Sequence, residues 1–249
     1  EFEFPKFVLI LIRITAFIVI SPVISMRGIP NTLKVTMAAG LSLVTYMGVP
    51  EIVVADSLLL LAFVALKEAL VGLALGYIVS LVFSTMQMAG QLIDFQVGFA
   101  MSQTYDPAMG INAGIYGTFY YWVSLCAFFI LDLHHILIAA LIKSFEYVPI
   151  GAVLFSGASM KAVLTVFVRI FELALNLAIP MIIVALVVDV VLGVVSRTIP
   201  QINVLMLGMP LKIMVSFLAM LVSVSWLIGK SGSIVQLIYK YLDGLMNLL

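Results

Sequence analysis

Long apolar blocks limit the fold of this chain more than any other feature. A helix that crosses a bilayer needs about 20 apolar residues, and several of the blocks are long enough. No alternation of the kind seen in membrane barrels is visible. The pattern predicts an all-helical, membrane-associated protein of long, kinked helices and helical hairpins. The blocks lie at about 7–26, 35–66, 69–89, 111–142, 162–196, 204–228 and 234–249.

The composition excludes several classes of protein. Of 249 residues, 64% are hydrophobic and 10% are charged, whereas soluble domains carry about 25% charged residues. The net charge is zero and there is no basic block, so nucleic acid is not an expected partner. The single cysteine, Cys126, excludes an internal disulfide.

One block is too long for an ordinary membrane span. Residues 159–196 would form a helix of about 57 Å, against a hydrocarbon core of about 30 Å, and Pro180 predicts a kink. Basic residues occur at nearly every break, so they predict no orientation. Breaks are expected near 28–31, 48–50, 149–151, 198–201 and 229–233.

Small and polar residues recur every four positions in one apolar block, and therefore share a helix face. Small residues allow a second backbone to approach closely. The stripe predicts a packing seam within the chain or with a partner helix; a substrate groove is the alternative. Its members are Glu68, Gly72, Gly76, Ser80 and Ser84.

A second polar stripe follows helical spacing later in the chain. Arg169 and Glu172 are three residues apart and are expected to pair. An intersubunit polar stripe is favoured over an ion pathway, because the stripe has no cluster of carboxylates. Its members are Lys161, Thr165, Arg169, Glu172 and Asn176.

Isolated charges interrupt other apolar runs. Charges at membrane depth face protein or water and need partners, so Arg13 and Lys212 are each expected to pair with an acidic residue. The other members of this group are Asp94, Asp132 and Asp189.

No residue pattern indicates catalysis, a metal or a cofactor. Asp132, His134 and His135 form the only histidine cluster in the sequence, but a metal needs three or four converging ligands, and adjacent helical residues point apart. The nucleotide, hydrolase and metalloprotease motifs are missing. The chain is therefore not expected to be an enzyme.

The segment 91–110 (QLIDFQVGFAMSQTYDPAMG) is polar between two apolar blocks. Asp106–Pro107 is expected to turn the chain, because the residue before a proline avoids helical geometry. Irregular backbone at membrane depth persists only when it is buried in protein or lines a cavity. A re-entrant loop that occludes a passage is one interpretation; an exposed loop between helices is the other.

Four stretches of sequence resemble the FliR/SctT family of type III secretion export-apparatus proteins, and more the flagellar FliR branch than the virulence SctT branch. They are 90–99 (GQLIDFQVGF) with Asp106–Pro107, 134–137 (HHIL) leading to 149–151 (PIG), 200–204 (PQINV), and 208–213 (GMPLKI). The last two match the family signature through Asn203, Gly208, Pro210 and Lys212.

The resemblance implies a FliP-like helical part over residues 1–157 and a FliQ-like helical hairpin over 158–249. It implies one copy in a helical, hetero-oligomeric cone with several FliP and FliQ homologues, joined by FlhB and FlhA. This export gate lies in the bacterial inner membrane at the flagellar basal body, largely on the periplasmic side. Unfolded flagellar proteins pass through its centre.

The resemblance also implies that a loop of about residues 97–113 is a plug that closes the pore. Thr104 departs from the apolar character expected of such a plug. The residues expected to form or shape it are Phe95, Gly98, Phe99, Met101, Tyr105, Asp106, Pro107 and Met109.

Two other functions compete with the export gate. A secondary transporter of small solutes or an ion-coupled carrier would place Asp94, Asp132 or Asp189 at a coupling site, but it is expected to show internal repeats, which are not visible. An intramembrane enzyme would need a paired catalytic set, and the sequence contains no such pair.

Overall fold

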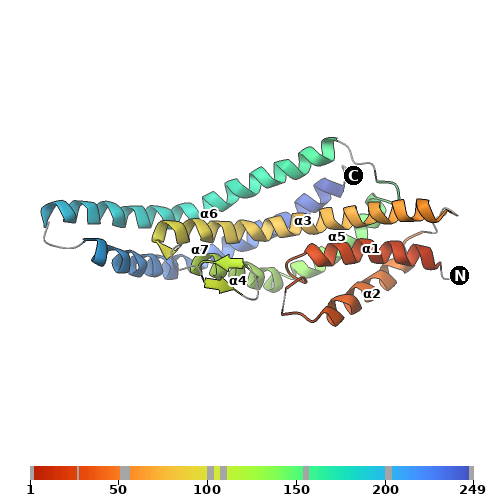
Figure 1. Cartoon of the computed structure of the whole chain (residues 1–249), viewed down its shortest axis with the longest axis horizontal. Coiled ribbons are helices and arrows are strands. Elements are labelled where there is room, and N and C mark those ends of the chain that lie inside the picture. The colour runs from red at the N-terminus through yellow and green to blue at the C-terminus, as the bar shows by residue number, and fades with distance from the viewer. Residues whose placement is uncertain are drawn as a thin grey trace. The chain divides into compact units, whose positions relative to one another are not determined.

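The computed structural model describes residues 3–26, 28–50, 57–99, 104–106, 111–153, 157–199 and 204–246. Within these ranges the chain is helical apart from one short hairpin, as predicted (Figure 1). The helices are α1 (Phe4–Ile20), α2 (Asn31–Gly48), α3 (Leu58–Val97), α4 (Ile115–Ile130), α5 (Leu133–Tyr147), α6 (Gly157–Thr198) and α7 (Val204–Met246).

The hairpin joins α3 to α4, and the sequence pattern did not predict it. Its strands are β1 (Thr104–Asp106) and β2 (Ile111–Ala113), paired antiparallel with Tyr105 opposite Asn112. Tyr105 and Asp106 therefore belong to a strand, and the turn expected at Asp106–Pro107 falls from Pro107 on, outside the described residues.

Prolines mark the starts and ends of several helices. Pro5 lies in the first turn of α1, where a missing N–H is tolerated. Pro30 precedes α2, and α2 ends two residues before Pro50. Further along, α6 runs through Pro180 and α7 through Pro210 without ending.

Two expected boundaries were wrong. The break expected at 229–233 lies inside α7, where the Ser231 and Ser233 hydroxyls donate to the carbonyls of Leu227 and Lys230 and are thereby accommodated within the helix. Conversely, the apolar block 111–142 is divided between α4 and α5. The division falls at Asp132, whose φ of 53° is left-handed.

The chain forms two compact units. The first comprises residues 1–82, 132–168 and 236–249, and the second comprises 83–131 and 169–235. In the first unit α1 packs against α2, and Ile10, Ile14 and Phe17 of α1 are buried. In the second unit the buried rings of Phe83 and Phe128 meet edge to face, with centroids 5.7 Å apart.

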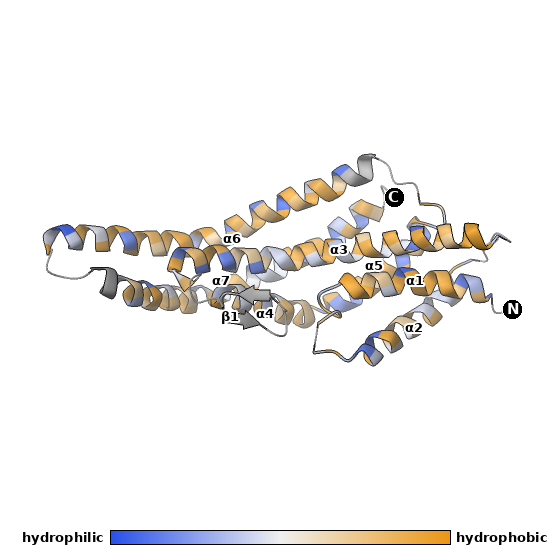
Figure 2. Ribbon diagram, viewed as in Figure 1, coloured by the Kyte–Doolittle hydropathy of each residue, from blue (hydrophilic) through white to orange (hydrophobic). Residues whose placement is uncertain are grey.

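Three of the described helices, α3, α6 and α7, are long and apolar enough to cross a membrane, or four spans if α4 and α5 count as one broken span. Hydrophobic residues cover most of α6, with isolated hydrophilic positions between them (Figure 2). Many of its apolar side chains are exposed in the single chain, including Phe167, Phe171 and Val190. Such surface requires lipid or protein around it.

Candidate functional site

The second unit contains the base of the loop between α3 and α4, and this base is the candidate functional site. Helix α3 ends at Val97, where the Gly98 N–H donates to the Asp94 carbonyl at 3.0 Å. Gly98 has a φ of 103°, a conformation that glycine adopts without strain and that commonly ends helices. The chain leaves α3 at this residue.

The Asp94 carboxylate joins the two ends of the loop. Its Oδ1 accepts the N–H of Tyr116 at 3.1 Å, and its Oδ2 accepts that of Gly117 at 2.9 Å. These are the second and third residues of α4, the positions that an N-cap side chain normally serves. Asp94 is buried, so it caps α4 from the preceding helix.

Two glycines make room for this contact. The residue at the N-cap of α4 is Gly114, and a Cβ there would lie 2.0 Å from the Asp94 Oδ2. A Cβ on Gly90 would lie 2.4 Å from the Gly117 Cα, whereas one on Gly117 would find its nearest neighbours at 3.5 Å. The end of α3 and the start of α4 thus touch backbone to backbone.

Aromatic rings from three elements meet beside this contact. The rings of Phe99, Tyr116 and Phe217 have centroids 6.0 to 6.2 Å apart, a spacing typical of favourable ring pairs. Tyr116 is fully buried. Helix α7, which carries Phe217, therefore supports the base of the loop.

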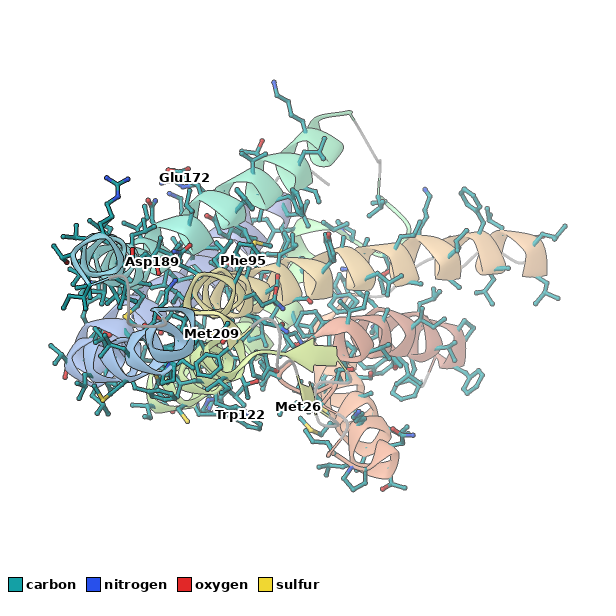
Figure 3. The ribbon with its side chains drawn as sticks, turned by 60° about the vertical axis from the view of Figure 1, so that its left-hand side comes forward. Met26, Phe95, Trp122, Glu172, Asp189 and Met209 are labelled. Carbon is teal, nitrogen blue, oxygen red and sulfur yellow. The ribbon has the colours of Figure 1, made fainter. Side chains whose placement is uncertain are left out.

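Polar side chains also connect the C-terminal end of α3 to α6 and α7. The Asp189 Oδ2 accepts from the Lys212 Nζ at 2.7 Å and from the Gln96 Nε2 at 3.2 Å. Figure 3 labels Asp189 on α6 and Met209, which lies one turn before Lys212 on α7. The acidic partner predicted for Lys212 is therefore Asp189.

The structure describes the side chains of some predicted plug residues, only the backbone pairing of others, and nothing of the rest. The side chain of Phe95 is 76% exposed, whereas that of Phe99 joins the aromatic contact. Tyr105 and Asp106 pair through their backbones with Asn112 and Ile111. Met101, Pro107 and Met109 lie outside the described residues. The role of this set as a plug stays a prediction.

The first unit contains a buried ion pair that supplies the partner predicted for Arg13. The Arg13 Nε lies 2.6 Å from the Glu68 Oε2, and neither side chain is exposed. Arg13 also donates to the carbonyls of Ser144 and Val148, each at 2.9 Å, and stacks on the Phe145 ring at 4.1 Å. This arrangement places a cation at the C-terminus of α5, which the helix dipole favours.

The stripe that begins at Glu68 faces α1 in its first half. A Cβ on Gly72 would lie 2.2 Å from the Arg13 carbonyl oxygen, and one on Gly76 would lie 2.8 Å from that of Phe17. Both glycines are buried, while Ser80 and Ser84 are half-buried. The two glycines therefore allow the backbones of α1 and α3 to touch.

The second stripe lies exposed on α6. All five of its residues, Lys161, Thr165, Arg169, Glu172 and Asn176, are exposed in the single chain. The Arg169 Nη1 and the Glu172 Oε2 pair at 2.5 Å, as the spacing predicted. Figure 3 labels Glu172 on this helix. An intersubunit role for the stripe stays a prediction.

Asp132, His134 and His135 lie closer together than the sequence suggested. Their ligand atoms all fall within 4.8 Å of one another, because Asp132 precedes α5 in a left-handed conformation and the imidazole rings stack at 4.1 Å. Asp132 and His135 are exposed. Three such groups do not make a metal site by themselves, so we assign none.

The family signature residues fall on α7 and just before it. Pro210 and Lys212 lie in the early turns of α7, and a Cβ on Gly208 would meet the Leu192 Cδ1 at 3.2 Å. Asn203 lies outside the described residues. Sequence reasoning missed Gln96, Phe217 and the capping role of Asp94. The one available signal was Gly114, an N-cap residue without a side chain.

These observations define a helical membrane protein with a hairpin loop held at its base by buried polar and aromatic contacts. The bacterial export proteins, family 1, match this chain over residues 4–237. That match covers most of the chain, and the chain belongs to this family.

Relatives support the same assignment. The flagellar biosynthetic protein FliR of Bacillus subtilis is 32% identical over 228 residues, which are 89% of this chain and 87% of that protein. The FliR proteins of Aquifex aeolicus and Escherichia coli are 30% and 27% identical, over 85% and 82% of this chain and 82% and 78% of their own lengths. The chain is thus similar to flagellar biosynthetic proteins over nearly its whole length.

Proposed function

We propose that this chain is a non-enzymatic subunit of the flagellar type III protein export gate in the bacterial inner membrane. Membership of the bacterial export family and similarity to flagellar biosynthetic proteins support a role in flagellar protein export. In this proposal the chain forms the entry pore with FliP and FliQ homologues. Its loop of about residues 97–113 seals the pore until unfolded flagellar proteins pass.

One observation carries the proposal of a seal. The loop between α3 and α4 is joined at its base by the buried carboxylate of Asp94 and contains a strand pair, β1 with β2. A loop can exclude water and ions from a narrow passage only when its ends are held in place. The hydrogen bonds of Asp94 at the base of the loop hold its ends in this way without a covalent link.

The proposed assembly also accounts for the exposed apolar surface of the helices. Residues 1–157 would correspond to a FliP-like part, and α6 with α7 would correspond to the FliQ-like hairpin of 158–249. Both helices expose many large apolar side chains, which neighbouring FliP and FliQ subunits of a cone would cover. FlhB and FlhA would complete the export apparatus, whose core would lie largely on the periplasmic side at the basal body.

Two of the three candidate carboxylates of the transporter alternative already have partners within the chain, whereas the third, Asp132, is exposed. Asp94 is occupied by two backbone N–H groups, and Asp189 is occupied by Lys212 and Gln96. A coupling site needs a carboxylate that is available to an ion. The export gate is the better-supported function because the family match and the flagellar relatives favour it, and no comparable observation favours a transporter.

The test replaces residues 100–112 with a Gly/Ser segment of equal length. The variant is coexpressed with FliP and FliQ homologues from one operon, and native mass spectrometry counts the subunits of the complex. We expect unchanged assembly and a raised ion conductance in planar bilayers, because the bulky side chains of the loop are lost while its two ends remain.

The parent complex and a complex with Gly40→Ala serve as controls, since a Cβ on Gly40 meets nothing within 4 Å in this chain. A complex with the same subunit count and the same conductance as the parent would contradict the seal. A chain that purifies alone and moves a small solute in liposomes would favour the transporter.

A further inference from the structure

The carboxylate of Asp94 holds α4 through hydrogen bonds alone. Among the residues that the structure describes, no lysine or arginine forms an ion pair with it. Its negative charge is instead met by the N–H groups of Tyr116 and Gly117. The positive end of the α4 dipole adds to this attraction.

Because the Asp94 carboxylate is buried, its contact requires α4 to stay packed against α3. Separation of α4 from α3 would leave a buried carboxylate and two orphaned N–H groups, each of which is costly without a partner. Gly114, as the N-cap residue, has no side chain that could take over the capping. The contact is therefore either made in this one geometry or lost.

The contact also determines where the loop begins and ends. Asp94 lies four residues before Gly98, where α3 has ended, and its partners are the second and third residues of α4, which begins directly after Gly114. The strand register, with Thr104 opposite Ala113, leads directly back to this base. Gly98 and Gly114, the two ends of the loop, thus both lie next to Asp94, one at its carbonyl and the other at its carboxylate.

We propose that Asp94 is the positioning residue of the loop: its bidentate contact with the start of α4 holds both loop ends together and thereby keeps the seal in place. The sealing role of the loop rests on the proposed function. The contact between Asp94 and the start of α4 is a property of the single chain. It predicts that weakening the contact releases the loop base before any subunit contact is lost.

Three substitutions separate this role from general damage to the fold. Asp94→Asn removes the charge and turns one acceptor into a donor that faces an N–H group. Gly114→Ala leaves Asp94 intact but places a Cβ 2.0 Å from its Oδ2. Gly40→Ala is the control, because Gly40 lies in α2, outside this contact, and its Cβ would meet nothing within 4 Å.

The first measurement is a distance across the loop base. Spin labels are placed at Phe95→Cys and Ile115→Cys, both exposed positions, in a full-length chain with Cys126→Ser, assembled with its FliP and FliQ homologues. We expect one narrow distance distribution in this parent and in Gly40→Ala. Asp94→Asn and Gly114→Ala are expected to replace it with a broader and longer one.

The second measurement is the ion conductance of the same complexes without labels. We expect Asp94→Asn and Gly114→Ala to raise it to a value between the parent and the Gly/Ser loop replacement, with Gly40→Ala at the parent value. Unchanged distances in both variants would overturn the inference. So would broadened distances with parental conductance while the loop replacement leaks.

The failure of the proposed function has a different signature. If the loop replacement does not raise conductance although Asp94→Asn broadens the distance distribution, the loop is not a seal but Asp94 still positions it. If Asp94→Asn does not assemble, the comparison of Gly114→Ala with Gly40→Ala decides the outcome, because both variants keep the carboxylate.

Discussion

Arg13 and Glu68 form a fully buried ion pair in which the Nε and Oε2 atoms lie 2.6 Å apart. Each partner is also satisfied elsewhere. Arg13 donates to the last carbonyls of α5, and the Glu68 Oε1 accepts the Gly151 N–H at 2.9 Å. The pair thus connects α1, α3 and α5 within the first unit.

Glu68→Gln is expected to destabilise the protein by about 3–5 kcal/mol, because it leaves the Arg13 charge buried without a counter-ion. Denaturant unfolding of the purified chain in detergent measures the loss. The double variant Arg13→Met with Glu68→Gln is expected to regain part of the stability, since it removes the unpaired charge. A single variant that costs less than about 1 kcal/mol would show that the pair is not buried as described.

Gly72→Ala is expected to cost about 1–3 kcal/mol, because its Cβ would overlap the Arg13 carbonyl oxygen at 2.2 Å and force α1 from α3. Gly40→Ala in α2 is the control, with no neighbour within 4 Å. It is expected to be neutral or to stabilise by about 0.4–1 kcal/mol. Equal effects in thermal unfolding would disprove the close approach of the two helices.

The Asp189–Lys212 pair is expected to contribute more than the Arg169–Glu172 pair. The first has side chains that are 43% and 14% exposed, against 53% to 54% for both side chains of the second. Double-mutant cycles should show a coupling free energy above about 1 kcal/mol for the first and about 0.2–0.5 kcal/mol for the second. Added salt should weaken the Arg169–Glu172 pair more than the less exposed Asp189–Lys212 pair. The reverse ranking would contradict the described burial.

The Phe99 and Phe217 rings are expected to be coupled. Their centroids lie 6.1 Å apart with planes at 79°, a geometry worth about 0.5–1.5 kcal/mol beyond area burial. A cycle of Phe99→Leu and Phe217→Leu measures this coupling. The exposed Phe95 provides the comparison, since Phe95→Leu and Phe217→Leu should be additive within about 0.5 kcal/mol. Additivity in both cycles would exclude support of the loop base by α7.

The helical class followed from hydropathy, because apolar blocks of this length have few ways to satisfy their backbones. Glycine and proline residues predicted some helix boundaries correctly and others wrongly. The sequence 28–31 does separate two helices, whereas 229–233 continues one. Serine can turn its hydroxyl to the preceding turn of a helix, so a Gly/Ser cluster does not by itself end a helix.

The polar residues divide in the same way. Pairs that are local in sequence, such as Arg169 with Glu172, were predictable because the helix repeat brings them together. Partners far apart in sequence were not. Arg13 and Lys212 required acidic partners, but only the packing of helices selected Glu68 and Asp189.

The loop shows the same limit most clearly. Its composition alone indicated an irregular segment between helices, because glycine, proline and aspartate disfavour a continuous apolar helix. That Asp94 caps α4 across 22 residues of sequence depended on tertiary structure. Local propensity acts over a few residues, whereas a buried carboxylate finds its donors only where packing brings a second backbone within hydrogen-bond distance.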